Sequence, residues 1–175
     1  MTTPANEPPK EESTTFIRPK KHTDWRAVGI RIAVIATATV LVCLFILRPM
    51  VINGESMMPT YSRRGFTFAF LPYFKLYEPQ RKQIVILKYG GFNTFLLKRV
   101  LAFPGERVEF RKGVLYVNGK AVDEPYVKNG CNWDMPPREV PKGKLFVVGD
   151  NRSMPMERHK YGMINRDHLA GVPIW

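Results

Sequence analysis

Cysteine and histidine are scarce in this sequence, and neither is arranged like a set of metal ligands. Two of the 175 residues are cysteines; Cys43 lies in a long apolar segment far from Cys131, so no disulfide is expected between them. The three histidines, His22, His159 and His168, follow no zinc-binding spacing, and we interpret them as exposed polar residues. The sequence therefore predicts no disulfide framework, no metal site and no cofactor.

The sequence contains no internal repeats, and a long helical pattern is missing outside one apolar segment. Short apolar runs that end at turn residues, a pattern typical of strands, take their place. A turn at Arg111-Lys-Gly113 joins two of these runs, and Asn118-Gly119, the strongest two-residue hairpin signal, follows the second. The runs cover residues 84–87, 108–110, 114–117 and 145–148. The predicted fold class is mainly β, a domain of short antiparallel strands behind a single N-terminal transmembrane helix.

The apolar segment extends from Val28 to Leu47 and carries one charge, Arg31, near its beginning. Twenty helical residues rise about 30 Å, the thickness of the hydrocarbon core of a bilayer. A cleaved secretory signal is the alternative, but the segment is long and ends in Arg48-Pro49 without a small-x-small cleavage site. The predicted organisation is a disordered cytoplasmic tail over 1–27, a transmembrane anchor over 28–47 and an extracytoplasmic β domain over 48–175.

Positive charge determines the expected orientation and the expected partner. Five Lys and Arg residues precede the segment, so the positive-inside rule keeps the N-terminus in the cytoplasm. From Arg48 onward 21 basic residues face 11 acidic ones, which leaves about +10 on the β domain. Such a domain can bind nucleic acid or lie on an anionic membrane surface, and the apolar segment favours membrane lipid over nucleic acid. The aromatic run 66–77 fits either a membrane interface or, in its first half, an alternating strand.

Three motifs follow the apolar segment in order. They are Gly54-Glu-Ser56-Met-Met-Pro-Thr60, Leu97-Lys98-Arg-Val-Leu-Ala-Phe-Pro-Gly-Glu106 and Gly149-Asp-Asn-Arg152, with Gly162 further on. Together they resemble the motifs of the bacterial type I signal peptidase (leader peptidase) family of Ser-Lys serine proteases, from the apolar segment to about Ile164. The resemblance implies a signal-peptidase-like β domain that removes N-terminal signal peptides from translocated preproteins. It also implies a single-pass protein of the bacterial cytoplasmic membrane, with its catalytic domain outside.

The resemblance implies that Ser56 is the nucleophile and Lys98 its general base. A serine hydroxyl is a poor nucleophile until a base removes its proton, and no histidine stands in a comparable motif. A lysine can serve when burial disfavours its charged form. Apolar residues precede and follow Lys98, and the neighbouring Arg99 would point to the opposite face of a strand.

Further site residues follow from motif alignment. Some members place an oxyanion-binding serine two residues before the nucleophile; this chain has Gly54 there, which leaves backbone N–H groups, chiefly that of Ser56. Asp150, Asn151, Arg152 and Glu157 are expected to support the site. Bulky residues are expected to line shallow pockets that admit only small side chains at −1 and −3 of the substrate, although ordinary core packing explains them equally well. They are Met50, Ile52, Met57, Tyr61, Ile86 and Leu97.

The third motif departs from the family pattern Gly-Asp-Asn-Arg-x-x-Ser-x-Asp-Ser-Arg-x-x-Gly. At the same length, Pro155 stands where a serine that orients the lysine is expected, Glu157 replaces the acid, and His159 replaces its arginine partner. Because Ser56 and Lys98 are both present, we favour an active enzyme. The alternatives are a specialised family protease acting on one partner, such as a pilin or conjugation protein, and an inactive membrane-anchored scaffold that binds signal sequences.

Overall fold

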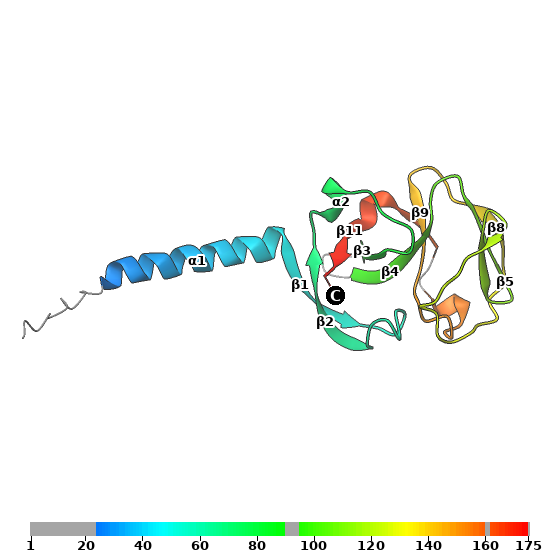
Figure 1. The fold of residues 1–175 in the computed structure, drawn as a ribbon, viewed down its shortest axis with the longest axis horizontal. Helices are drawn as coiled ribbons and strands as arrows, with labels where there is room; N and C mark the ends of the chain where they lie inside the picture. The colour runs from blue at the N-terminus through cyan, green and yellow to red at the C-terminus, as the bar shows by residue number, and fades with distance from the viewer. Residues whose placement is uncertain (1–23, 90–94, 160–161, 175) are drawn as a thin grey trace, which may run out of the picture. The chain divides into compact units, whose positions relative to one another are not determined.

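The computed structural model describes residues 24–89, 95–159 and 162–174 (Figure 1). Tertiary contacts divide the chain into two units, with the boundary between Ala36 and Thr37. Most of the expected tail over 1–27 lies outside the described residues.

The apolar segment forms one helix, with ends that differ from the expected ones. Helix α1 extends from Trp25 to Phe45, whereas the apolar pattern predicts Val28 to Leu47. It begins early because the side chain of Asp24 caps it, accepting a hydrogen bond of 3.0 Å from the amide of Arg26. It ends early because Pro49 disfavours helical backbone just before it, so Leu47 already pairs in a sheet.

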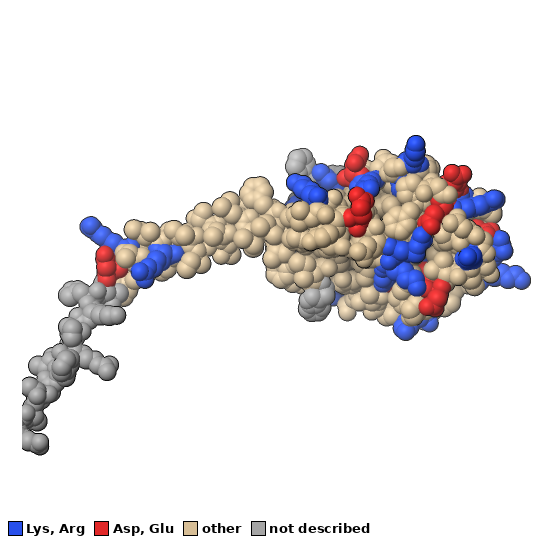
Figure 2. All heavy atoms as spheres, turned by 45° about the horizontal axis from the view of Figure 1, so that its top comes forward, with Lys and Arg blue, Asp and Glu red and all other residues tan. Residues whose placement is uncertain are grey.

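Helix α1 is long and apolar enough to cross a membrane, by length and composition alone, and none of its most apolar stretch is buried. Figure 2 shows the charged side chains of the helix gathered near its beginning, where Arg26 and Arg31 lie, and many more over the β-rich part of the chain. A single N-terminal apolar helix of this kind fits a membrane-anchored protein.

The β-rich unit is built from two antiparallel sheets (Figure 1). The seven-stranded sheet has the order β1-β2-β11-β3-β4-β9-β10, and the four-stranded sheet has the order β7-β6-β5-β8. The first sheet contains β1 (Leu47–Asn53), β2 (Arg64–Phe70), β3 (Ile84–Lys88), β4 (Phe95–Ala102), β9 (Lys144–Val148), β10 (Gly162–Asn165) and β11 (Leu169–Pro173). The second contains β5 (Arg107–Arg111), β6 (Val114–Val117), β7 (Lys120–Ala121) and β8 (Met135–Glu139). The remaining helices described are short: α2 (Tyr73–Leu76) and the 3₁₀ turns η1 (Met156–Arg158) and η2 (Arg166–His168). The prediction of a mainly β domain is confirmed.

Both predicted tight turns are present. Arg111 pairs with Val114 and Val117 pairs with Lys120, so two-residue turns join β5 to β6 and β6 to β7. The central residues of both turns have positive φ, from 47° at Lys112 to 83° at Gly113, as the favoured hairpin turns require.

The first half of the aromatic run forms strand β2, as its alternation predicts. Thr67 and Ala69 are buried, whereas the alternate residues Phe66 and Phe68 are exposed. The alternation places a small inward face on the sheet and an aromatic face outside.

Strand β4, which carries the lysine motif, is held from both sides. It lies between β3 and β9, and its residues enter both apolar cores of the unit. Val100 packs in the smaller core with Val85 and Val147. Leu101 and Ala102 pack in the larger core, which contains residues from both sheets. A central strand that packs on both faces is a rigid support for the side chains that it carries.

Candidate active site

Ser56 lies in a turned segment that leaves the end of β1. Within it the amide of Met58 donates to the carbonyl of Glu55, and the amide of Tyr61 donates to that of Met57, both over 3.0 Å. Met57 is buried and fastens the segment to the domain, while Ser56 itself is half-buried. The serine side chain is therefore presented by an ordered turn and not by a loose loop.

The third motif holds this turn from behind. The backbone amide of Asn151 donates to the carbonyl of Ser56 over 3.0 Å, and the side-chain amide of Asn151 donates to the carbonyl of Glu55 over 3.0 Å. Gly149 touches the same carbonyl so closely that an added Cβ would lie 2.1 Å from the oxygen of Ser56. Two motifs that are distant in sequence thus form one packed unit.

The lysine motif reaches the same place through strand pairing. Arg99 pairs with Val148 in the antiparallel register of β4 and β9, so the preceding residue, Lys98, comes beside Gly149. Lys98 is only 1% exposed and pairs on its other side with Val85. Strand alternation directs its side chain to the face of β4 opposite to that of Arg99.

Arg99 and Asp150 form a buried ion pair at the centre of the site. Two Arg99 nitrogens donate to the two carboxylate oxygens of Asp150, over 2.8 and 2.6 Å. The hydroxyl of Thr60 also donates to Asp150, over 2.5 Å, so the carboxylate fastens the end of the serine motif to the lysine strand. Arg99 donates a further bond of 2.6 Å to the carbonyl of Lys82, and its guanidinium lies 3.8 Å from the ring centroid of Tyr126.

A second buried pair supports the Gly149–Asn151 turn. Arg152 donates to the carbonyl of Gly149 over 2.9 Å and to both carboxylate oxygens of Glu124 over 3.0 and 2.6 Å. The hydroxyl of Tyr126 donates to the same carboxylate over 2.7 Å. Burial and the Glu124 carboxylate raise the pKa of Tyr126, so its phenol stays a protonated donor. Sequence analysis did not find Glu124 and Tyr126, because no motif marks them.

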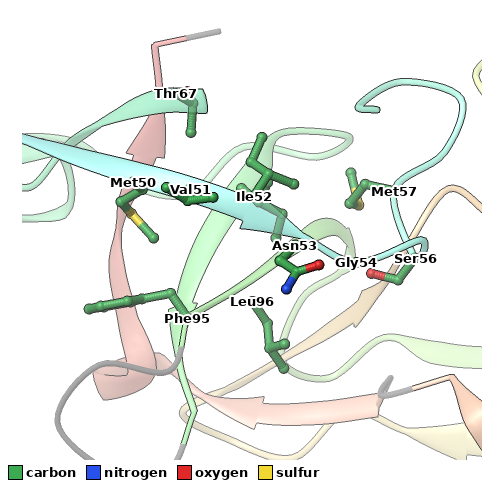
Figure 3. Close-up of a pocket in the computed structure, with 11 residues that line it drawn as sticks. Met50, Val51, Ile52, Asn53, Gly54, Ser56, Met57, Thr67, Phe95 and Leu96 are labelled. Atoms are coloured by element: carbon green, nitrogen blue, oxygen red, sulfur yellow. The ribbon is translucent and has the colours of Figure 1, made fainter. Parts of the chain in front are cut away.

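A pocket of about 520 Å³, partly open to solvent, borders Ser56. Figure 3 shows Ser56 at one end of it and Met50 and Phe95 at the other. Of the expected pocket residues, Met50, Ile52, Met57 and Leu97 line it. Additional lining residues that the sequence did not indicate are Val51, Asn53, Thr67, Phe95 and Leu96.

Two expected pocket residues lie elsewhere. Ile86 is fully buried in the sheet, paired with Leu97, so for this residue core packing is the better interpretation. Tyr61 lines a neighbouring hollow together with Ile52 and Thr60. Burial raises the pKa of the Tyr61 phenol.

The departures from the family pattern lie in different environments. Pro155 and Glu157 are exposed and line a second cavity, whose wall includes neither Ser56 nor Lys98. The turn carries Pro155 to the surface. The hydroxyl of Ser153 donates to the side-chain oxygen of Asn151 over 2.6 Å. Among the expected supports, Asp150, Asn151 and Arg152 surround the serine turn, whereas Glu157 lies on this second cavity.

His159 is not the exposed polar residue that the sequence predicts. It is 3% exposed, and its ring packs edge-on against Trp133 with 5.0 Å between centroids. Burial, together with the charges of Lys98 and Arg152, lowers the pKa of His159 to about 3. The imidazole is therefore neutral at physiological pH. His168 is exposed as expected, and His22 lies outside the described residues.

The backbone donors near Ser56 are unequal. The Gly54 amide donates to the carbonyl of Arg63 over 2.9 Å and is thereby occupied. In the part of the chain that the structure describes, no group of three or more His, Cys, Asp or Glu residues is arranged to hold a metal ion.

Comparison with known proteins identifies the class of protein and then the family. The family model described as "Signal peptidase, peptidase S26" matches residues 25–174. Signal peptidase I S of Bacillus subtilis (strain 168) is 34% identical, over 92% of this chain and 91% of that relative. A signal peptidase I of Bacillus amyloliquefaciens is 36% identical over 85% and 84%, and signal peptidase IB of Staphylococcus aureus (strain COL) is 32% identical over 81% and 83%. A solved signal peptidase I from Enterococcus faecalis V583 shares 27% identity with a TM-score of 0.47, over 55% of this chain and 97% of that chain.

These matches define a hydrolase of the peptidase class. The chain belongs to the S26 signal peptidase family, and it is an enzyme that acts as a signal peptidase. The resemblance seen in the sequence is confirmed, and membership implies the removal of signal peptides.

Proposed function

We propose that this protein is a membrane-bound serine endopeptidase in which Ser56 is the nucleophile and Lys98 the general base. The observation that carries the proposal is the convergence of the three motifs: the Gly149–Asn151 turn packs on the carbonyl of Ser56, and strand pairing brings buried Lys98 beside Gly149. A buried lysine beside a presented serine is what a Ser-Lys dyad requires.

The reaction begins with the neutral amine of Lys98. Its Nζ takes the proton from Oγ of Ser56, and Oγ attacks the carbonyl carbon of substrate residue −1. The amide of Ser56 donates to the oxyanion of the tetrahedral intermediate. The Lys98 ammonium then returns the proton to the leaving amine as the peptide bond breaks, and water activated by the same amine hydrolyses the acyl-enzyme.

The environment of Lys98 favours the neutral amine that this step requires. Lys98 is only 1% exposed, and burial disfavours an ammonium. The nearby cation Arg99 lies on the other face of β4 and is compensated by Asp150. The buried pair therefore stiffens the strand that carries Lys98.

The pocket suits an extended peptide with small side chains. Among the described strands β1 is the edge of its sheet, and its residues 50–53 line the pocket that ends at Ser56. A substrate running beside β1 could hydrogen-bond to that edge. Residues −1 and −3 of an extended chain point to the same side, so both would face the walls formed by Ile52, Leu96 and Leu97.

We expect substitution of Ala by Leu at −1 of a preprotein to lower kcat/KM at least about 100-fold, because the bulky walls leave no room for the larger side chain. The measurement uses purified full-length enzyme in detergent and a labelled preprotein with Ala at −1 and −3. Leu at −2 is the matched control, since that side chain points away, and its kcat/KM should stay within about threefold. Equal cleavage of the −1 Ala and −1 Leu substrates would show that this pocket does not receive residue −1. A scaffold without activity would bind the preprotein and leave it uncut.

Membrane anchoring by α1, with the N-terminus in the cytoplasm of a bacterial cell, is part of the proposal. Its support is the apolar, unburied helix and the basic residues that precede it. The exposed side chains of Val51, Phe66 and Phe68 add an outward apolar strip on paired strands β1 and β2, suited to the membrane interface.

Protease added outside cells stripped to their inner membrane is expected to digest the β domain and to spare a tag placed before residue 1. A cytoplasmic marker protein in the same sample reports that the membrane is intact. Immunoblots against the tag and against the β domain give the result. Protection of the β domain with loss of the tag would reverse the proposed topology.

A further inference from the structure

His159 occupies a position behind the serine turn that the proposed mechanism leaves unused. A Cβ added to Gly149 would lie 2.1 Å from the carbonyl oxygen of Ser56 and 2.8 Å from Cε1 of His159. The His159 ring packs edge-on against Trp133, with 5.0 Å between the ring centroids. Gly149 therefore lies close to both the serine turn and the buried imidazole.

The charged groups around this ring come from three segments. Burial lowers the pKa of His159 to about 3, helped by Lys98 of β4, which is protonated at such acidic pH, and by Arg152 of the turn after β9. The backbone of Asn151 acts in the opposite direction and raises the pKa of His159. The carboxylates of this region are engaged elsewhere: Asp150 with Arg99, and Glu124 with Arg152. Glu157, on the same short turn as His159, is exposed.

We propose, resting on the Ser56–Lys98 function above, that His159 is a positioning residue: its neutral ring wedges the Gly149–Asn151 turn against the carbonyl of Ser56 and keeps the neighbourhood of Lys98 from gaining another fixed cation. An arginine at position 159 would add a third cation near Lys98 and Arg152, while Glu157, on the same turn, is exposed at the surface. An aromatic, neutral side chain fills the space beside Trp133 without that cost.

The first test measures the ionisation of the His159 ring and does not depend on catalytic activity. Histidine ring signals are followed by NMR across the pH range in the full-length protein in micelles, and are assigned by His22→Gln, His159→Gln and His168→Gln. The His159 ring should stay neutral down to about pH 4, and Lys98→Met should raise its pKa because one repelling cation is removed. The exposed His168 is the comparison signal, which Lys98→Met should not move. A His159 ring that titrates near pH 6.5, or one unaffected by Lys98→Met, would overturn the proposal.

The second test reads catalysis. His159→Gln should lower kcat about tenfold and leave KM within twofold, because the contact of the ring with the Gly149–Asn151 turn is weakened. The acidic limb of the pH profile of kcat/KM should not move, because no charge is added. His159→Arg should move that limb to lower pH by about one unit, because a fixed cation disfavours the ammonium form of Lys98. His168→Gln and His168→Arg are the matched controls and should leave rate and limb unchanged. A folded His159→Arg enzyme with an unmoved limb would overturn the proposal; if that variant does not fold, the NMR titration and His159→Gln decide.

Different results would contradict the Ser56–Lys98 dyad and the role of His159. Turnover that persists in Ser56→Ala or Lys98→Met would refute the dyad, and the NMR titration would still report whether the His159 ring is neutral beside Lys98. If both dyad variants lose activity but His159 titrates near pH 6.5, only the proposed positioning role of His159 is refuted.

Discussion

Ser56→Ala and Lys98→Met are each expected to lower kcat/KM by at least about a thousandfold, because the reaction needs both the attacking oxygen and the base. The double variant should be no slower than either single variant, since the two groups act as one unit. Methionine fills the space of buried Lys98 without a charge, so thermal unfolding of both variants should stay close to wild type. The rates are measured on a preprotein with Ala at −1 and −3.

Lys142→Met provides the matched control for the lysine variant, because Lys142 is exposed in the turn before β9. Its kcat/KM should be within about twofold of wild type. Near-normal turnover in folded Lys98→Met would refute Lys98 as the base, and additive losses in the double variant would show that the two residues act independently.

Gly149→Ala is expected to have the second largest effect. Its Cβ would lie 2.1 Å from the oxygen and 2.9 Å from the carbon of the Ser56 carbonyl, which is backbone and cannot rotate away. The serine turn must therefore shift, and we expect the free energy of unfolding to fall by about 1–3 kcal/mol and kcat/KM by at least about 100-fold. Chemical denaturation and steady-state kinetics measure the two effects.

Gly130→Ala is the control for this prediction, because nothing lies within 4 Å of the added Cβ and the site is an exposed loop. It should change neither stability nor rate. A Gly149→Ala enzyme with wild-type rate would mean that the close approach of the third motif does not position Ser56.

Local sequence signals predicted the parts of the fold that local chemistry determines. The runs at 84–87 and 145–148 became β3 and β9, and Asn118-Gly119 closed a two-residue hairpin, because alternation and positive-φ residues act within a few residues. Strand β8 was not predicted: it contains Pro136 and Pro137, which are tolerated because β8 is an edge strand. Edge position is a property of the sheet and not of the segment.

The same distinction between local signals and tertiary packing applies to the site. Ser56, Lys98 and Asp150 were found from motifs, and the structure brings their segments together. The Glu124–Arg152 pair, the pocket wall at Phe95 and the burial of His159 were missed or misinterpreted, since each depends on which segments pack against it. Pro155 was placed by alignment beside the lysine, but the chain turns it outward before η1.

The most direct test of the central claim is to identify the bond that is cut. Purified full-length protein is incubated with a preprotein, and the products are analysed by mass spectrometry beside a matched Ser56→Ala preparation. The account predicts a single new N-terminus directly after a small-x-small sequence with the wild-type enzyme, and intact preprotein with Ser56→Ala. A mature-length product from Ser56→Ala, or wild-type cleavage after bulky residues, would contradict it.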